Sequence, residues 1–185
     1  MSDAPEIAVI GAGSWGTALA IQLGRAGCRP TLWGREPEVI ESLQRDRSNS
    51  VFLPDIPLPD SVAISADLDA VVQAHRDILI CVPSHVFRQV LESIKPKLRP
   101  DARIVWATKG FELSSGKLPH EVAHETLGQD VPLAVVSGPT FATEVGQGLP
   151  TAMTVAATHG DFADDLAAMF TDENFRAYTS DDMIA

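Results

Sequence analysis

The sequence predicts an α/β fold built on a doubly wound, mostly parallel sheet, and three observations support this. A short apolar run, residues 6–10, leads directly into a glycine-rich turn at residues 11–16. After that turn, segments typical of strands and helices alternate along the chain. The 185 residues, 45% of them hydrophobic, are enough for one domain with a sizeable core. Successive βαβ units of this kind form a parallel sheet with helices on both faces.

The glycine-rich turn, Gly-Ala-Gly-Ser-Trp-Gly, is typical of dinucleotide-binding units of the Rossmann type because it joins a strand to a helix. Gly11 permits the sharp turn, Gly13 leaves room for a pyrophosphate, and Gly16 lets helix and strand pack closely. The helix is expected to begin near Ser14, where its N–H groups and dipole favour an anion. The alternative is a turn that only closes a βα unit.

The first half of the chain supplies the next elements in order. The first helix, predicted over 14–26, ends at Gly27, a residue that commonly terminates helices. A strand at 30–34 and a helix at 36–46 follow. The segment 49–59 contains three prolines, which exclude both a helix and a central strand. A short strand at 62–65, a helix at 67–74 and a strand at 77–82 complete this half.

The second half continues the alternation. A helix is predicted at 85–98, where Val86, Val90, Leu91 and Ile94 form one apolar face. Strands are predicted at 103–107, 132–137, 151–157 and 174–179, with a helix at 160–170. The chain then ends at residues 181–185 with no recognisable cap, so we expect it to be a fragment, with residues 1–185 forming the dinucleotide-binding domain.

The charge distribution limits the possible ligands. The net charge of −11 argues against a nucleic acid or an anionic membrane surface as a partner. Residues 118–185 contain 11 acidic residues and one basic residue, Arg176, so the cations for an anionic ligand must come from earlier residues. Cys28 and Cys81 are too few for a disulfide framework or a metal site, and Cys81 is expected to be a buried structural thiol. With no candidate membrane span, a cytoplasmic location is expected.

Cofactor choice is expected to depend on the end of the second strand. A site that prefers NAD usually places Asp or Glu there, to bind the ribose hydroxyls. Here Gly34 occupies that position and Arg35 follows, so a guanidinium can pair with a 2′-phosphate, which favours NADPH over NADH. Glu36 is an alternative ribose ligand that would allow both cofactors. Arg35 and Glu36 also fit an ordinary solvated helix start.

Polar motifs follow three predicted strands, at the edge where ligands of open α/β sheets bind. Val-Pro-Ser-His spans 82–85, Ala-Thr-Lys-Gly-Phe-Glu spans 107–112, and Ser-Gly-Pro-Thr spans 137–140. Lys109 is the most informative, because an ammonium near a nicotinamide can stabilise developing alkoxide charge; a surface lysine is the alternative. Gly138 and Thr140 either open a helix that binds substrate oxygens or form a Gly-Pro turn capped by Thr140. Three histidines, His85, His120 and His124, are expected to be surface or capping groups.

These motifs together resemble the bacterial-type NAD(P)-dependent glycerol-3-phosphate dehydrogenases. The matching segments run in order along essentially the whole chain: residues 11–20, Leu-Trp-Gly-Arg at 32–35, the proline-rich loop, Val-Pro-Ser at 82–84, Thr-Lys-Gly at 108–110, and Ser-Gly-Pro-Thr-Phe-Ala at 137–142. The resemblance implies that Ser14, Trp15, Arg35, Lys109 and Ala142 contact the cofactor. It also implies that Lys109, Gly138 and Thr140 contact the substrate.

The implied reaction is hydride transfer between NAD(P)H and dihydroxyacetone phosphate, which gives sn-glycerol 3-phosphate for phospholipid synthesis, by an enzyme expected to be a homodimer. Family members carry the general acid–base lysine and a phosphate-binding arginine in a further helical domain. This chain has no lysine after Lys117, so that lysine is expected beyond Ala185 and no catalytic residue or metal within the chain. The alternatives are a 2-hydroxyacid or ketopantoate reductase relative and a non-catalytic dinucleotide sensor.

Overall fold

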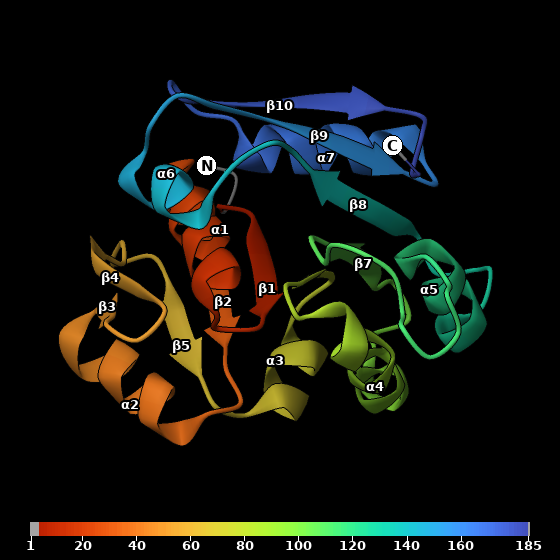
Figure 1. Ribbon diagram of the computed structural model, residues 1–185, viewed down its shortest axis with the longest axis horizontal. Coiled ribbons are helices and arrows are strands. Elements are labelled where there is room, and N and C mark those ends of the chain that lie inside the picture. Colours follow the sequence, from red (N-terminus) through yellow and green to blue (C-terminus); the bar gives the residue numbers. More distant parts are fainter. Residues whose placement is uncertain (1–3, 185) are drawn as a thin grey trace.

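A computed structural model describes residues 4–184, which form one eight-stranded sheet covered by helices on both faces (Figure 1). The strand order is β10-β9-β8-β7-β6-β1-β2-β5. The strands are β1 Glu6–Ile10, β2 Arg29–Trp33, β5 Ala63–Ser65, β6 Asp77–Ile80, β7 Arg103–Trp106, β8 Leu133–Ser137, β9 Thr151–Ala157 and β10 Phe175–Ser180. The helices are α1 Ser14–Arg25, α2 Pro37–Asp46, α3 Leu68–Ala74, α4 Ser84–Ile94, α5 Pro119–Leu127, α6 Ala142–Gln147 and α7 Gly160–Phe170.

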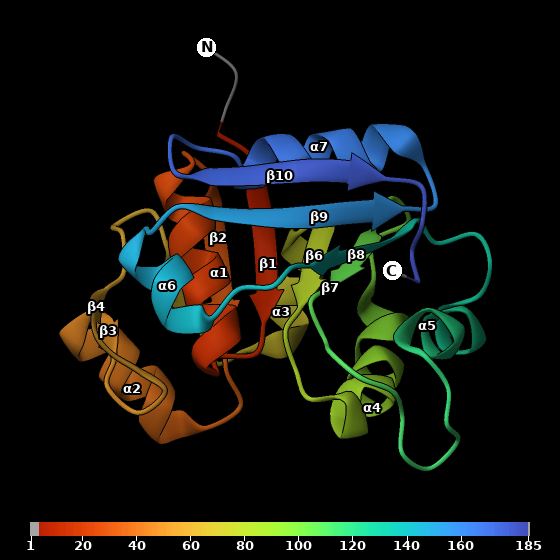
Figure 2. The ribbon, with the colours of Figure 1, turned by 45° about the horizontal axis from the view of Figure 1, so that its top comes forward.

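The sheet is mostly parallel, as the sequence predicts. β1 pairs in parallel with β2 and with β6, so that Ile10 stands opposite both Trp33 and Ile80. β5, β7 and β8 continue the same direction. β9 then runs antiparallel to β8, and β10 runs parallel to β9 (Figure 2). The carboxyl ends of six strands therefore meet at one edge, and those of the last two strands point the other way.

The core lies in two layers, one on each face of the sheet. The strands in the middle of the sheet are apolar on both sides, and every residue of β6 and β7 is buried, which is the pattern of a parallel sheet between helices. On one face α1, α2 and α7 pack around residues such as Leu19, Leu43 and Phe162. On the other face α3, α4 and α5 pack around Leu91 and Val122.

The structure adds one helix to those predicted, shortens another and refines the prediction for the proline-rich loop. α5 at Pro119–Leu127 is a helix that the sequence analysis does not include, and it begins with a proline, which is well tolerated in the first helical turn. α4 ends at Ile94, and residues 95–97 form a separate 3₁₀ turn. The proline-rich segment adds no helix and no central strand, as predicted, but β3 Ser48–Asn49 and β4 Leu53–Pro57 pair there as a small separate sheet.

The end of α1 follows the sequence prediction. Gly27 has φ of +92°, a value that favours glycine, and the N–H of Cys28 donates to the carbonyl of Leu23 at 3.0 Å. This pattern closes the last turn of the helix and directs the chain into β2.

None of the helices between residues 4 and 184 combines the length and the hydrophobicity that a membrane span requires. Ala185, and the lysine expected beyond it, lie outside the described residues.

Candidate dinucleotide-binding site

The glycine turn after β1 is built so that only glycine fits at two of its three glycine positions. Gly11 has φ of +120°, and a Cβ there would lie 2.4 Å from the carbonyl oxygen of Cys81. A Cβ on Gly16 would lie 1.8 Å from the carbonyl oxygen of Gly11. These two glycines therefore let the turn, α1 and β6 approach closely. Gly13 is different, because a Cβ there would meet no atom within 4 Å.

The space over Gly13 faces the amino end of α1. Gly13 is the N-cap residue of the 12-residue helix, and among the described residues no side chain caps its first turn. Ser14, the first helical residue, is exposed. The N–H groups of the first turn and the positive end of the helix dipole are thus available to an anion in this open space. The turn has the shape predicted for Gly11, Gly13 and Gly16, and the cofactor-binding roles of these residues and of Ser14 stay predictions.

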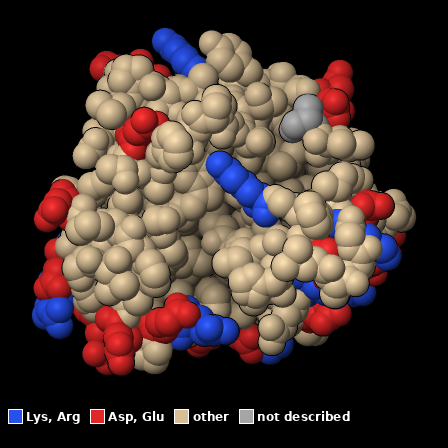
Figure 3. Space-filling view, in the orientation of Figure 1, with Lys and Arg blue, Asp and Glu red and all other residues tan. Residues whose placement is uncertain are grey.

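A cavity of about 510 Å³ lies over the carboxyl ends of β1, β2 and β6. Its walls come from Gly11 and Gly13, from Trp33 at the end of β2 and the two residues Arg35 and Glu36 beyond it, from residues 81–83 after β6, and from α4. Figure 3 shows that the molecule is hollowed near the centre of this view and that charged side chains gather mainly toward the rim. The cavity thus extends from the anion position to a mostly uncharged groove, which suits a nucleotide.

Arg35 and Glu36 both line this cavity. The Arg35 side chain is 79% exposed, and its guanidinium lies 3.5 Å from the Glu36 carboxylate. Gly34, which stands where an acidic residue is usual, is buried, and a Cβ there would lie 2.8 Å from the Cβ of Ala12 and 2.9 Å from the Cδ1 of Ile40. The cavity therefore presents a cation and an anion together, and the preference for NADPH stays a prediction.

Lys109 follows β7 and lies beside the first turn of α1. Its ammonium nitrogen is 5.2 Å from the centre of the Trp15 ring, a cation–π distance. The preceding residue, Thr108, is buried, and its hydroxyl donates to the carbonyl of Val82 at 2.8 Å. The Trp15 indole nitrogen is buried with no hydrogen-bond partner among residues 4–184. Lys109 therefore lies next to the glycine turn, and its role in binding cofactor and substrate stays a prediction.

Lys109 also lines a second cavity, of about 270 Å³, with Thr108, Gly110, Ser137 and His120. This cavity lies over the ends of β7 and β8, next to the first turn of α5. His120 was expected to be a surface or capping group, and it is found among the residues that line this second cavity together with Lys109. The signal in the sequence was slight, since α5 itself was not predicted.

The segment after β8 differs from both sequence predictions for it. α6 begins at Ala142, with Phe141 as its N-cap residue, so residues 138–140 do not open the helix. Thr140 does not cap it either, because its hydroxyl is buried without a partner among the described residues. Gly138 is closely packed, since a Cβ there would lie 2.9 Å from the carbonyl oxygen of Ala152. Ala142 packs against the core, and the substrate and cofactor roles of these residues stay predictions.

Cys81 is half-buried at the base of the first cavity, and burial raises the pKa of its thiol. A thiol in this state is a poor nucleophile, which agrees with the structural role expected from the sequence. No motif of the sequence indicates Arg88, which α4 carries between Val86 and Gln89, two residues that line the first cavity.

Comparisons with known proteins agree with this geometry. Residues 6–163 match the model of the family described as NAD-dependent glycerol-3-phosphate dehydrogenase N-terminus. A Glycerol-3-phosphate dehydrogenase [NAD(P)+] of Klebsiella pneumoniae (strain 342) is 56% identical over 177 residues, which are 95% of this chain and 52% of that protein. The chain spans about half the length of the curated relatives it matches.

Solved structures give the same picture. A glycerol-3-phosphate dehydrogenase from Coxiella burnetii superimposes with a TM-score of 0.92 at 43% identity, over 98% of this chain and 55% of that one. A ketopantoate reductase from Ralstonia eutropha JMP134 shares the fold alone, with a TM-score of 0.67 at 22% identity over 96% of this chain and 57% of that one.

Proposed function

The chain belongs to the NAD-dependent glycerol-3-phosphate dehydrogenase family, and from this membership we propose that it is the NAD(P)H-binding part of an enzyme that interconverts dihydroxyacetone phosphate and sn-glycerol 3-phosphate. The observation that carries the proposal is the open space over Gly13, where the backbone of the turn and the amino end of α1 meet. A pyrophosphate needs this combination of free N–H groups and absent side chain.

Each residue of the site has a physical role in this proposal. Gly11 and Gly16 shape the turn, and the first turn of α1 donates N–H groups to the pyrophosphate. Arg35 extends over the cavity, where a guanidinium can pair with the 2′-phosphate of NADPH; Glu36 beside it can accept from ribose hydroxyls, so NADH is also possible. When bound, the nicotinamide supplies or accepts the hydride.

Lys109 is proposed to bind both cofactor and substrate. Its ammonium stands at the carboxyl edge of the sheet, where it can hold a carbonyl or hydroxyl oxygen and stabilise negative charge on that oxygen. Gly138 and Thr140 are proposed to assist substrate binding and Ala142 cofactor binding. Proton transfer is proposed to need a lysine outside these 185 residues, in a helical domain. A role in phospholipid synthesis, a cytoplasmic location and a homodimeric parent enzyme stay predictions.

The test is a titration of the purified 185-residue chain with NADPH up to about 1 mM, the upper end of ordinary enzyme affinities. NADPH should quench tryptophan fluorescence, because Trp33 lines the cavity. Absence of binding over this range would refute the cofactor proposal.

Activity is measured in parallel with dihydroxyacetone phosphate. The 185-residue chain should remain at background while the intact gene product oxidises NADPH. Turnover by the 185-residue chain would show that no outside lysine is needed. An intact gene product that binds NADPH but oxidises none with any small phospho-ketone would favour a dinucleotide sensor instead.

A further inference from the structure

The loop that carries Lys109, residues 107–118, is buried at Ala107 and Thr108 but has little apolar packing to hold it after that point. No helix or strand is formed between β7 and α5. Phe111 is 52% exposed and Leu113 is 78% exposed, so neither side chain anchors the loop by burial. Gly110 and Gly116 both have positive φ, at +86° and +73°, so the chain turns sharply twice. The position of Lys109 therefore depends on polar contacts.

Glu112 is the centre of those contacts. Its backbone N–H donates to the carbonyl of Lys117 at 2.8 Å, and its carbonyl accepts from the N–H of Gly116 at 2.7 Å. Its carboxylate accepts from the Ser115 hydroxyl at 2.5 Å. These bonds close the loop on itself around Glu112. They make it compact, but they do not fix it against the rest of the molecule.

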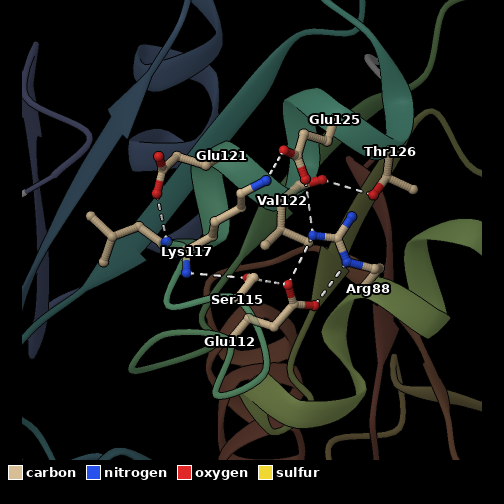
Figure 4. A network of polar contacts seen from close by, with 9 residues as sticks. Arg88, Glu112, Ser115, Lys117, Glu121, Val122, Glu125 and Thr126 are labelled. Carbon is tan, nitrogen blue, oxygen red and sulfur yellow. Dashed lines mark hydrogen bonds and ion pairs between the residues drawn. The ribbon is translucent and has the colours of Figure 1, made fainter.

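Arg88 attaches this closed part of the loop to the rest of the molecule, as Figure 4 shows. Its Nε and one terminal nitrogen each donate to the Glu112 carboxylate at 2.8 Å, which is the two-bond geometry that suits a planar guanidinium. The same terminal nitrogen lies 3.0 Å from the carboxylate of Glu125 on α5. Lys117, at the end of the loop, also contacts Glu125. Arg88 thus joins α4, the loop and α5.

Through Arg88, α4 connects the dinucleotide cavity to the loop that carries Lys109. Val86 and Gln89, its near neighbours on the helix, line the dinucleotide cavity, whereas the Arg88 guanidinium contacts Glu112. Glu112 is three residues after Lys109. The wall of the cofactor cavity and the loop that carries Lys109 are therefore linked at two points: by the Thr108–Val82 hydrogen bond at the start of the loop, and by this ion pair, whose side chains are 30% and 11% exposed.

We propose that Arg88 and Glu112 are positioning residues that hold Lys109 over Trp15 beside the dinucleotide cavity. The proposal rests on the proposed function for the role of Lys109, but the geometry concerns the protein without cofactor. If Arg88 loses its charge, the loop keeps its internal bonds and loses its main link to α4, so the ammonium leaves the Trp15 ring. In a chain that already carries Arg88→Met, replacing Lys109 should then change NADPH affinity only slightly.

The experiment uses the 185-residue chain with Arg88→Met and Lys109→Met, alone and combined. Arg99→Met is the matched control, because Arg99 also makes two bonds to one carboxylate, that of Asp101, but precedes β7 at the opposite edge of the sheet. Glu112→Gln is a second variant that preserves side-chain volume and remains informative if Arg88→Met does not fold. Circular dichroism establishes folding, and calorimetry measures NADPH binding. Of the three tryptophans, all among residues 4–184, only Trp15 makes a cation–π contact with Lys109, so the change in emission that Lys109→Met causes without cofactor is the reference signal for Trp15.

Lys109→Met should weaken NADPH binding about fivefold, the size of a typical cation contact. Arg88→Met should weaken binding by a similar factor and shift the tryptophan emission as Lys109→Met does. In the Arg88→Met background, Lys109→Met should add less than about a twofold change, because neighbours in one network are not additive. Arg99→Met should alter neither the NADPH affinity nor the tryptophan emission.

Independent effects of the two substitutions, or a tryptophan emission in folded Arg88→Met and Glu112→Gln that equals that of the unmodified chain, would overturn the inference. Failure of the proposed function gives a different result. In that case the unmodified chain would not bind NADPH at all, while the comparison of emission spectra without cofactor would still decide whether Arg88 positions Lys109.

Discussion

The ammonium group of Lys109 lies 5.2 Å from the centre of the Trp15 ring, which places the end of β7 against the start of α1. Trp15 lies within the glycine-rich turn, two residues after Gly13, so the cation stands next to the proposed anion position. A contact of this kind at an exposed site contributes about 0.5–1 kcal/mol. The pair connects the loop after β7 to the first turn of α1, and the fluorescence of Trp15 can report on this contact.

Replacing Gly13 should separate cofactor binding from folding. Gly13→Ala puts a methyl group into the space proposed for the pyrophosphate, where it meets no protein atom within 4 Å. NADPH affinity should fall at least about tenfold while the free energy of unfolding changes by less than about 1 kcal/mol. Gly160→Ala is the control, because it also meets no atom and lies in α7. Unchanged affinity in Gly13→Ala, measured by calorimetry, would contradict the proposed site.

Gly16→Ala should act on the fold itself. The added methyl carbon would lie 1.8 Å from the carbonyl oxygen of Gly11, so α1 or the turn must move. We expect a loss of more than about 3 kcal/mol in the free energy of unfolding, in the range of severe core substitutions. Urea denaturation followed by circular dichroism measures this, and a loss below about 1 kcal/mol would be incompatible with the close packing described.

Arg35 is expected to decide between the two nicotinamide cofactors. Arg35→Ala removes the cation that lines the cavity, so NADPH affinity should fall about tenfold or more while NADH affinity stays within about twofold. Arg45→Ala is the control, because Arg45 is an exposed arginine paired with Asp46 on α2. Equal losses for both cofactors would mean that Arg35 does not contact a 2′-phosphate.

The ion pair between Arg103 and Asp77 should be important for stability and not for binding. The Arg103 guanidinium donates to both Asp77 carboxylate oxygens at 2.6 and 2.8 Å, both side chains are 6% exposed, and the hydrogen bonds to Asp77 raise the arginine pKa. Asp77→Asn should cost about 3 kcal/mol of unfolding free energy, because among the described residues it leaves the buried guanidinium with only the half-exposed Asp165, at 2.7 Å, as a charged partner. Glu6→Gln, in an exposed pair with Arg29 at 3.7 Å, should cost less than about 1 kcal/mol. Similar costs for both would contradict the prediction.

Acidification should weaken the Arg88–Glu112 pair. Hydrogen bonding from Arg88, assisted by Ser115, lowers the pKa of Glu112 from 4.5 to about 2. Since the folded state holds the proton less tightly, the pair stabilises the fold fully above pH 4.5, and this contribution disappears as the pH falls toward about 2. The difference in melting temperature between the unmodified chain and Glu112→Gln should therefore shrink over this interval. A constant difference would contradict the assignment.

The sequence predicted the strands and helices best where burial is one-sided or complete. The apolar run at 6–10 and the segments at 151–157 and 160–170 form elements with the predicted bounds, because their hydrophobic patterns are long and clear. α5 was missed, and its first residue, Pro119, resembles a loop signal. The carboxylate of Glu121 caps the helix by accepting from the N–H of Leu118, a contact that depends on the folded geometry of the turn. The antiparallel entry of β9 depends on packing partners far away in the chain.

The site was predictable where a motif fixes the backbone. Gly11, Gly13 and Gly16 have the expected arrangement because their spacing determines the turn itself. The neighbourhood of Lys109 and Trp15 was less accessible, because 94 residues separate them in the sequence. Arg88 and Glu112 could not be paired in advance, since nothing in a single sequence specifies which charged side chains of α4 and of the loop after β7 meet.

The crowding around Gly34 restricts how the cofactor preference of this scaffold can be redesigned. Introducing an aspartate at that position, the usual route to NADH selectivity, would drive a side chain into Ala12 and Ile40. Engineering would have to shrink Ile40 at the same time, or work from Glu36 at the rim. A laboratory selection for NADH use should accordingly recover paired substitutions, with single replacements of Gly34 rare among the survivors.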